Sequence, residues 1–410
     1  MQSGMRAAAV VLLALLVPAC GGDFGGFFVP FPNTAANGFL RGSQVVPALG
    51  TGATGTATIT SDGLGKFVDY TIAATGLGTV TAIEIRLGDP GENGAVILTI
   101  PLGAFPLSGR IDAPTFFAPV AGLSTFAEIC SAIAEGHTYL LISTVAQAAG
   151  EIRAHLGKAA LASAKLTGGQ MVPPVATTGS GSATVELDPA QAQITVTLTV
   201  AGVTGITGAQ IREGAPLVAG GVLFDVSAAP FTSPLTVILT SGDFTPSGTI
   251  ATFTDAINAF LSGGLYIQVN AAQSIRGQVG PTQLSAFMTG ANVVNPSGSA
   301  ATGTATLALN GSQTAFFVTV THTVAAADRS TISAATAGTN GPMIFNLAAT
   351  AGAATSPFST TVTPSRLIPN TPANILTFPD AVNALLTGGT YIDVGNASFP
   401  GGEIRDQLLP

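Results

Sequence analysis

Residues 388–408 read "GGTYIDVGNASFPGGEIRDQL", and two earlier stretches of the chain repeat this phrase with changes. Residues 136–156 read "GHTYLLISTVAQAAGEIRAHL", and residues 263–279 read "GGLYIQVNAAQSIRGQV". Each stretch contains a tyrosine-led run of strand-forming residues, a turn, and a second short run that includes an arginine. Three occurrences of one strand–turn–strand unit predict three copies of a β-rich module.

Two further phrases precede each closing stretch at constant spacing. The opening phrase starts at Leu40, Leu166 and Met288, in the forms "LRGSQVVP", "LTGGQMVPP" and "MTGANVVNP". Fifteen residues after each start comes a second phrase, "GTATIT", "GSATVEL" or "GTATLAL". The starts lie 126 and 122 residues apart, which is too long for a solenoid repeat and suits an independent domain. We therefore expect three domains, at residues 39–156, 166–280 and 288–408.

The local patterns within a copy are those of strands and one short helix. In "ITVTLTV", residues 194–200, aliphatic residues alternate with threonines, which is the pattern of a half-buried strand. Helical spacing appears once per copy, in "STFAEICSAIAEG", "TFTDAINAFLSGG" and "TFPDAVNALLTGG", just before the closing strands. The predicted class is all-β, with three tandem antiparallel β-sandwich or barrel modules that each contain one short helix.

Composition excludes two classes of function. The chain has 410 residues and a net charge of −8, and its 13 lysines and arginines are scattered, so it lacks the basic cluster that nucleic-acid binding requires. Hydrophobic residues make up 47% of the chain but occur in short alternating runs. Beyond the first 20 residues, no run approaches the roughly 18 apolar residues of a spanning helix.

The N-terminus has the layout of a secretory signal. Arg6 is followed by an apolar run over residues 7–17 and then by small residues that end at Cys20. The stretch "LVPAC" resembles the lipobox of bacterial lipoproteins, whose cysteine is acylated, while an ordinary signal that ends near a cysteine is the alternative. We expect residues 1–20 to be a lipoprotein signal peptide, Cys20 to be lipidated, and residues 21–38 to form a Gly-, Pro- and Phe-rich tether. This places the protein in the cell envelope, held to a membrane, on the outer membrane or the cell surface.

The remaining cysteine and one histidine are expected to be structural. Cys130 has no intramolecular partner if Cys20 carries lipid, and its helical context predicts a buried small side chain. His322 falls on the apolar face of Val318 and Val320, which is typical of a satisfied core histidine. The chain contains no G-x-S-x-G elbow, Walker A loop or H-E-x-x-H motif, so we expect no enzymatic activity.

The ordered set of phrases resembles a known family. The L-x-G-x-x-x-V-P opening, the G-[ST]-A-T phrase and the closing tyrosine strand followed by G-E-I-R are similar to the CHRD domain, named for chordin and also found in bacterial secreted proteins. The resemblance covers about residues 39–156, 166–280 and 288–408. It implies an immunoglobulin-like β-sandwich related to Cu/Zn superoxide dismutase, here in three tandem copies on a bacterial lipoprotein.

Family members commonly carry A-H-I-H-x-G and Y-V-N-V-H-T phrases, whose histidines suggest a shared metal ion. The matching positions of this chain hold other residues: Glu84, Arg86 and Ser143 in copy one, Gln210, Arg212 and Asn270 in copy two, and Thr331, Ser333 and Gly395 in copy three. The three histidines of the chain, His137, His155 and His322, occupy unrelated places. We therefore expect no metal site and no cofactor.

Several charged residues are candidates for contacts instead. Glu84 and Arg86 stand two apart on a predicted strand, as Gln210 and Arg212 do, so each pair projects from one face. These four form a candidate polar binding face, with a solvated strand face as the alternative.

Other charged residues lie near turns and module ends. In the closing phrase, Glu151 and Arg153, Glu403 and Arg405, and Arg276 alone are expected to make a surface pair or to clasp the module. Asp89 and Glu92 in "GDPGENG" suit a turn, and calcium binding is the less favoured interpretation.

The function expected from these features is non-enzymatic. A tethered row of like domains extends reach from the membrane and multiplies weak contacts. This favours extracellular binding, adhesion or scaffolding, with a protein or glycan as partner. The alternatives are a purely structural envelope component and a degenerate Cu/Zn-type metalloprotein that has lost its ligands.

Overall fold

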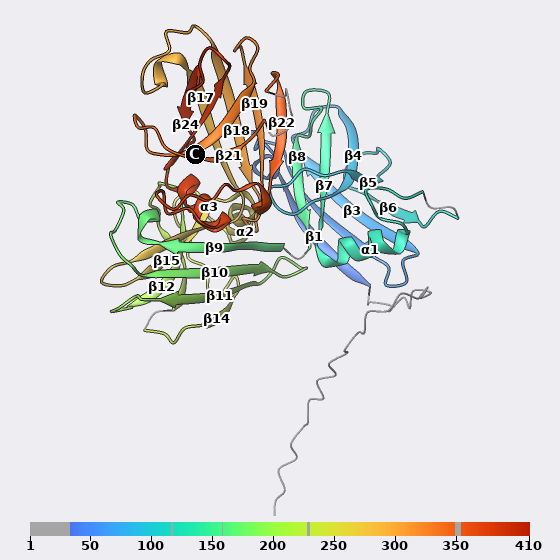
Figure 1. The fold of residues 1–410 in the computed structure, drawn as a ribbon. Coiled ribbons are helices and arrows are strands. Elements are labelled where there is room, and N and C mark those ends of the chain that lie inside the picture. Colours follow the sequence, from blue (N-terminus) through green and yellow to red (C-terminus); the bar gives the residue numbers. More distant parts are fainter. Residues whose placement is uncertain (1–32, 116–117, 158, 228–229, 349–353) are drawn as a thin grey trace, which may run out of the picture.

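The computed structural model describes residues 33–115, 118–157, 159–227, 230–348 and 354–410 (Figure 1). It contains three eight-stranded antiparallel sheets, one for each sequence copy, which we call modules 1, 2 and 3. The predicted all-β class with three tandem modules is confirmed. The predicted signal peptide, Cys20 and most of the predicted tether lie outside the described residues.

The elements follow the same order in every module. Module 1 contains β1 (Thr34–Arg41), η1 (Gly42–Gln44), β2 (Thr54–Ser61), β3 (Phe67–Thr75), β4 (Val80–Leu87), β5 (Val96–Thr99), β6 (Leu107–Asp112), α1 (Phe126–Glu135), β7 (Thr138–Thr144) and β8 (Ile152–Leu156). Module 2 contains β9 (Ala159–Thr167), η2 (Gly168–Gln170), β10 (Ser180–Leu187), β11 (Ile194–Ala201), β12 (Gly208–Glu213), β13 (Val222–Ser227), β14 (Leu235–Leu239), α2 (Phe253–Ser262), β15 (Leu265–Asn270) and β16 (Ile275–Val279). Module 3 contains β17 (Thr282–Thr289), η3 (Gly290–Asn292), β18 (Thr302–Leu309), β19 (Phe316–His322), β20 (Arg329–Ala334), β21 (Met343–Asn346), β22 (Phe358–Val362), η4 (Pro364–Arg366), α3 (Phe378–Leu386), β23 (Thr390–Gly395) and β24 (Ile404–Gln407).

Each sheet is nearly divided into two halves. In module 1 the strand order is β5-β4-β7-β8-β1-β2-β3-β6, and β8 meets β1 at a single residue pair, Arg153 with Arg41. The corresponding single pairs are Arg276 with Thr167 in module 2 and Arg405 with Thr289 in module 3. The two four-stranded halves therefore turn about this corner and enclose one core between them, as the sheets of a sandwich do.

Alternation along the strands builds each core. In β11, Ile194, Val196 and Leu198 are fully buried, while the intervening threonines face outward, as the sequence pattern predicted. The helix of each module lies against the same core. Cys130 on α1 is fully buried and its Sγ lies 3.7 Å from the Phe67 carbonyl oxygen, which confirms its predicted burial.

The three predicted helices are all present, because their ends are well defined in sequence. Thr125, Thr252 and Thr377 each cap a helix and form a capping box with the acidic residue three positions later. Gly263 ends α2 in the left-handed conformation, with a φ of 80°. No helix in the described part of the chain is long and apolar enough to cross a membrane.

The first strand of each module begins before its opening phrase. β1, β9 and β17 start at Thr34, Ala159 and Thr282, whereas the expected domains start at residues 39, 166 and 288. The early part of β1, "TAANG", consists of small residues without large alternating apolar side chains, so it carries no strand signal. The last five residues of the predicted tether thus belong to the sheet.

The modules gather around one another instead of forming the expected extended row (Figure 1). A turn in module 2 docks on module 1, where Gln191 Nε2 donates to the His155 carbonyl oxygen at 3.0 Å. The equivalent turn of module 3 docks on module 2 in the same way, from Gln313 to the Gln278 carbonyl oxygen at 2.9 Å. Module 3 also contacts module 1, so each module touches both others.

Candidate functional site

The predicted polar face lies on the outer side of one half-sheet in every module. Arg86 on β4 lies opposite Tyr139 on β7, and Arg212 on β12 lies opposite Tyr266 on β15. In module 3 the same register places Ser333 on β20 opposite Tyr391 on β23. We call this side of each module the outer face.

The four predicted polar residues bond within their own modules. Arg86 forms an ion pair with Glu84 at 2.7 Å and donates to the Gly94 carbonyl oxygen at 3.3 Å. Burial acts to lower the pKa of Arg86, but the hydrogen bonds to Glu84 and its charge outweigh this and raise the pKa. In module 2, Arg212 donates to Gln210 Oε1 at 2.9 Å and to the Gly220 carbonyl oxygen at 3.0 Å. Each arginine therefore ties the outer face to the loop after its strand.

A second arginine fastens the same loop from the other side. The Arg153 guanidinium lies 3.6 Å from the centre of the Tyr139 ring and donates to the carbonyl oxygens of Glu92 and Asp89, at 2.7 and 3.0 Å. The Tyr139 hydroxyl accepts a hydrogen bond from the Gly94 amide at 3.0 Å. Arg153 is 1% exposed, and this burial lowers its pKa to about 10. Loop 88–94 is thus held by a tyrosine and an arginine together, an arrangement we call the clasp.

Modules 2 and 3 repeat the clasp. Arg276 lies 3.5 Å from the Tyr266 ring centre and donates to two loop carbonyl oxygens, those of Val218 and Ala215. Arg405 lies 3.4 Å from the Tyr391 ring centre. It donates to the Thr339 carbonyl oxygen and to Asn340 Oδ1.

The prediction that Glu151 pairs with Arg153, and Glu403 with Arg405, on the surface is wrong. Glu151 accepts hydrogen bonds from the hydroxyls of Thr51 and Thr144 instead of bonding Arg153, because Arg153 is drawn under the loop onto a ring. Glu403 likewise accepts from Ser299 and Asn396. The alternative, that an arginine clasps the module, is confirmed. The sequence signal was the tyrosine shared with the arginine by all three closing phrases.

The histidines His137 and His322 lie in different modules, and the turn carboxylate Asp89 lies beside His137. His322 Nε2 lies 2.6 Å from the Ala354 carbonyl oxygen within the core of module 3, whereas its buried Nδ1 has no hydrogen-bond partner among the described residues. The prediction of a satisfied histidine is therefore confirmed for one ring nitrogen only. His137 Nδ1 lies 3.0 Å from Asp89 Oδ1 on the surface of module 1. Within the described ranges, no three side chains of His, Cys, Asp or Glu gather as metal ligands would. Burial raises the pKa of the Cys130 thiol to about 11, which leaves it protonated at neutral pH.

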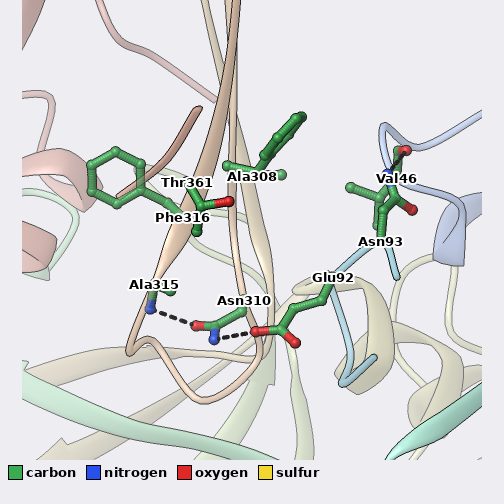
Figure 2. A pocket seen from close by; sticks show the side chains of 10 residues that line it. Val46, Glu92, Asn93, Ala308, Asn310, Ala315, Phe316 and Thr361 are labelled. Carbon is green, nitrogen blue, oxygen red and sulfur yellow. Dashed lines mark hydrogen bonds between the residues drawn. The ribbon is translucent and has the colours of Figure 1, made fainter. Parts of the chain in front are cut away.

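A hollow of about 300 Å³ lies where module 1 meets module 3 (Figure 2). Figure 2 shows the Asn310 amide between the two modules: its Nδ2 donates to Glu92 Oε1 at 2.8 Å, and its Oδ1 accepts from the Ala315 amide at 3.1 Å. Glu92 belongs to the loop that the module 1 clasp holds. The clasp therefore also fixes a contact between modules, which makes the hollow part of an interface.

A third set of contacts joins each module to the helix of the next. Gln44 Nε2 donates to Asn258 Oδ1 on α2 at 3.0 Å, and Gln170 Nε2 donates to Asn383 Oδ1 on α3 at 3.1 Å. Near these bonds, Phe39 packs against the core of module 2. At the matching position of module 2, Lys165 forms an ion pair with Asp380 of module 3.

Module 3 carries the matching surface, and within the described residues this surface is exposed at Phe287. Asn292 takes the place of the glutamines and donates to Asp406 Oδ1 within module 3, at 3.1 Å. Phe287, which matches Phe39 and Lys165 in register, is 59% exposed. Asp406, which accepts a hydrogen bond from the Phe287 amide, lines a hollow of about 360 Å³ together with residues 291–294, 296, 337–338, 405 and 407. We call Phe287, Asn292 and this hollow the end face.

Comparison with known proteins gives one match. The family model described as "CHRD domain" matches residues 38–156, 162–279 and 284–408, which correspond to the three modules. No curated protein and no solved structure matches the chain.

Proposed function

Because the chain belongs to the CHRD domain family over all three modules, we propose that it is a non-enzymatic binding or scaffolding protein of the cell envelope. It is attached to a membrane through a lipid on Cys20 and presents the three-module body outside the cell. The family establishes the modules, and the role is inferred from their surfaces.

The end face of module 3 is the observation that carries this proposal. In modules 1 and 2 the same surface binds the helix of the next module, through Gln44 and Gln170. In module 3 that surface is preformed, and Phe287 is among its exposed residues. An exposed aromatic side chain beside a hollow is typical of a protein-binding site.

The partner that best suits this face is a protein that presents a capped helix. Within the chain, this surface of module 1 contacts α2 and that of module 2 contacts α3. Both helices begin with a Thr–Asp capping box and carry an asparagine on the contact side. A partner helix with a similar first turn meets Phe287 in the place of Phe39 or Lys165, and Asn292 in the place of Gln44 or Gln170. A glycan has no counterpart among the contacts that this surface makes in modules 1 and 2.

Site-specific cross-linking tests the proposed contact. A photoreactive amino acid is placed at position 287 in cells that produce the protein, and cross-linked products are identified by mass spectrometry. We expect a covalent adduct with one defined protein, which then binds the purified chain and is lost with Phe287→Asp. The same label at Phe39 is expected to cross-link to module 2 of its own chain, which verifies the chemistry.

A label at a second exposed position, Ile238, provides the control for the cross-linking experiment. Ile238 has nearly the same exposure, 58%, but lies on β14 away from the end face, so a label there should give no adduct with the partner. No adduct at position 287, or an adduct of equal yield at both positions, contradicts the proposal. An adduct of the chain with itself assigns the end face to self-association instead.

Lipid attachment is tested separately. Cells are grown with a fatty acid that carries an alkyne, and the protein is compared with its Cys20→Ser variant. We expect the label and membrane association in the unchanged protein and neither in the variant. Equal labelling of both would contradict acylation at Cys20.

A further inference from the structure

The outer face of module 3 lacks a side chain that modules 1 and 2 share. In those modules the arginine across from the clasp tyrosine, Arg86 or Arg212, donates to a glycine carbonyl oxygen of the loop. The register of β20 places Ser333 at this position, opposite Tyr391. A serine side chain is too short to reach across the space that an arginine spans.

A hollow of about 480 Å³ occupies this part of module 3. Ser333, Tyr391, Gly341, Asn340 and Asp393 are among the residues that line it. Ser333 is 4% exposed and lines the hollow. The small side chain of Ser333 thus leaves open the space that an arginine side chain occupies in modules 1 and 2.

The hollow is also lined by a carboxylate, that of Asp393, which modules 1 and 2 lack at this position. Asp393 takes the position of Leu141 in module 1 and Gln268 in module 2, and it is 2% exposed. Its Oδ1 bonds the Arg329 guanidinium at 2.6 Å, and its Oδ2 accepts from the Thr331 hydroxyl at 2.8 Å. Burial raises the pKa of Asp393 in spite of Arg329, so a further positive charge nearby would stabilise the carboxylate.

We propose that this hollow binds the guanidinium group of an arginine side chain from a partner protein, in the place that Arg86 and Arg212 fill in modules 1 and 2. The planar fork of a guanidinium suits a carboxylate and a carbonyl oxygen together, whereas an ammonium does not. Met343, which lines the hollow and is half-exposed, offers apolar surface to the methylene stem. The net charge of −8 favours the approach of a basic segment.

This site goes beyond the proposed function and does not depend on the end face. The two sites use different side chains, so a variant of one leaves the other intact. Phe287→Asp is therefore expected to leave arginine binding unchanged. Failure of either proposal is then distinguishable from failure of the other.

Calorimetric titration of the purified chain tests the proposal with three small probes. N-acetyl-arginine amide is the ligand mimic, N-acetyl-citrulline amide has its shape without the charge, and N-acetyl-lysine amide has the charge without the fork. We expect one arginine probe bound per chain, since modules 1 and 2 fill the site themselves. The citrulline and lysine probes should bind at least about tenfold more weakly.

Substitutions at the site sharpen the result. Ser333→Arg restores the side chain of the sibling modules and should abolish binding, while Ser333→Ala should change affinity by less than about threefold. Asp393→Asn should weaken binding at least about tenfold. If Ser333→Arg does not fold, Ser333→Leu fills the hollow without a charge and is expected to abolish binding equally.

Four outcomes would overturn the assignment: no binding of the arginine probe, three sites per chain, equal binding of the citrulline probe, or unchanged binding in the filled variant. Each of these results means that the hollow is not a guanidinium site.

Discussion

Modules 1 and 2 use one polar surface to contact the helix of the next module, whereas the matching surface of module 3 makes no such contact among the described residues. Gln44 and Gln170 reach the helix of the next module, whereas Asn292 bonds within its own module. Arg86 and Arg212 fill the outer face, whereas Ser333 leaves it hollow. One fold therefore serves two purposes: the first two modules hold neighbours, and the last offers open surface.

The opposite end of the series shows the complementary change. Gln191 and Gln313 sit at a left-handed turn position, with φ values of 54° and 56°, and bond the preceding module. The matching turn position of module 1 is Gly65, whose φ is 66° and whose amide bonds Asp62 as the amide of Gln191 bonds Asp188. A glutamine in this conformation is strained, and its contact with the preceding module compensates. Glycine adopts this conformation without strain, so Gly65 needs no such contact.

Removing the clasp arginine should give the largest effect in this comparison. Arg153→Ala leaves two loop carbonyl oxygens without a donor and removes the cation–π contact with Tyr139, so we expect a loss of roughly 3 kcal/mol in the free energy of unfolding. Arg405→Ala should cost less, because one of its acceptors is a side chain, Asn340, that can turn to water. Urea unfolding of both variants measures the difference.

A surface arginine provides the control for this experiment. Arg110 is half-exposed, and it pairs with Asp69 and also covers the Phe67 ring. Arg110→Ala should shift the urea midpoint far less than Arg153→Ala does, because water replaces its partners. Equal losses for Arg153→Ala and Arg110→Ala would mean that the clasp contributes nothing beyond an ordinary surface pair.

The clasp also marks the limit of what the sequence predicts. The repeats, the helical spacing before each closing phrase and the alternation in residues 194–200 are local signals, and the structure bears them out. A charged residue two positions from Glu151 is ordinarily a surface residue, and nothing local indicates that loop 88–94 covers Arg153. Burial of that kind depends on tertiary contacts, which periodicity does not carry.

The contacts between modules could not be predicted from the sequence for a similar reason. Gln191 and Gln313 look like ordinary turn residues, and Gln44 belongs to a phrase whose repetition suggests only a shared fold. Their acceptors lie in other modules, at sequence separations that no repeat pattern encodes. The four residues of the predicted polar face were located correctly on strands β4 and β12, but their partners within the module became visible only in the structure.

Acid should weaken the junction of modules 2 and 3 more than that of modules 1 and 2. Burial acts to raise the pKa of Asp380, but hydrogen bonds from Lys165 and Thr377 outweigh it and lower the pKa to about 2. A depressed carboxylate pKa contributes stability above the unfolded value of 3.8, and that stability is lost as the pH falls toward 2. The difference in melting temperature between the unchanged chain and Asp380→Asn should therefore be largest near pH 5, decrease through pH 2 and vanish only below it.

Asp255 supplies the comparison at the other junction. It occupies the same capping position on α2, but the residue that matches Lys165 is Phe39, which has no charge. Asp255→Asn should therefore show a smaller dependence on pH over the same range. A dependence as large as that of Asp380→Asn would assign the effect to helix capping, not to the contact between modules.

The smallest expected effect comes from making module 1 resemble module 2. Glu84→Gln gives Arg86 an uncharged acceptor, as Gln210 is for Arg212 at the same strand positions. Both side chains of the pair are partly buried, and a pair of this kind contributes about 0.5–1 kcal/mol. The loss of stability on substitution should shrink as salt is raised from low concentration to 1 M, because salt screens the ion pair and leaves the hydrogen bond to Gly94.

Urea unfolding at the two salt concentrations measures this loss, with Gln210→Glu as the reverse change. If Glu84→Gln costs more than Arg153→Ala, the outer-face arginine, not the clasp, is what holds the loop.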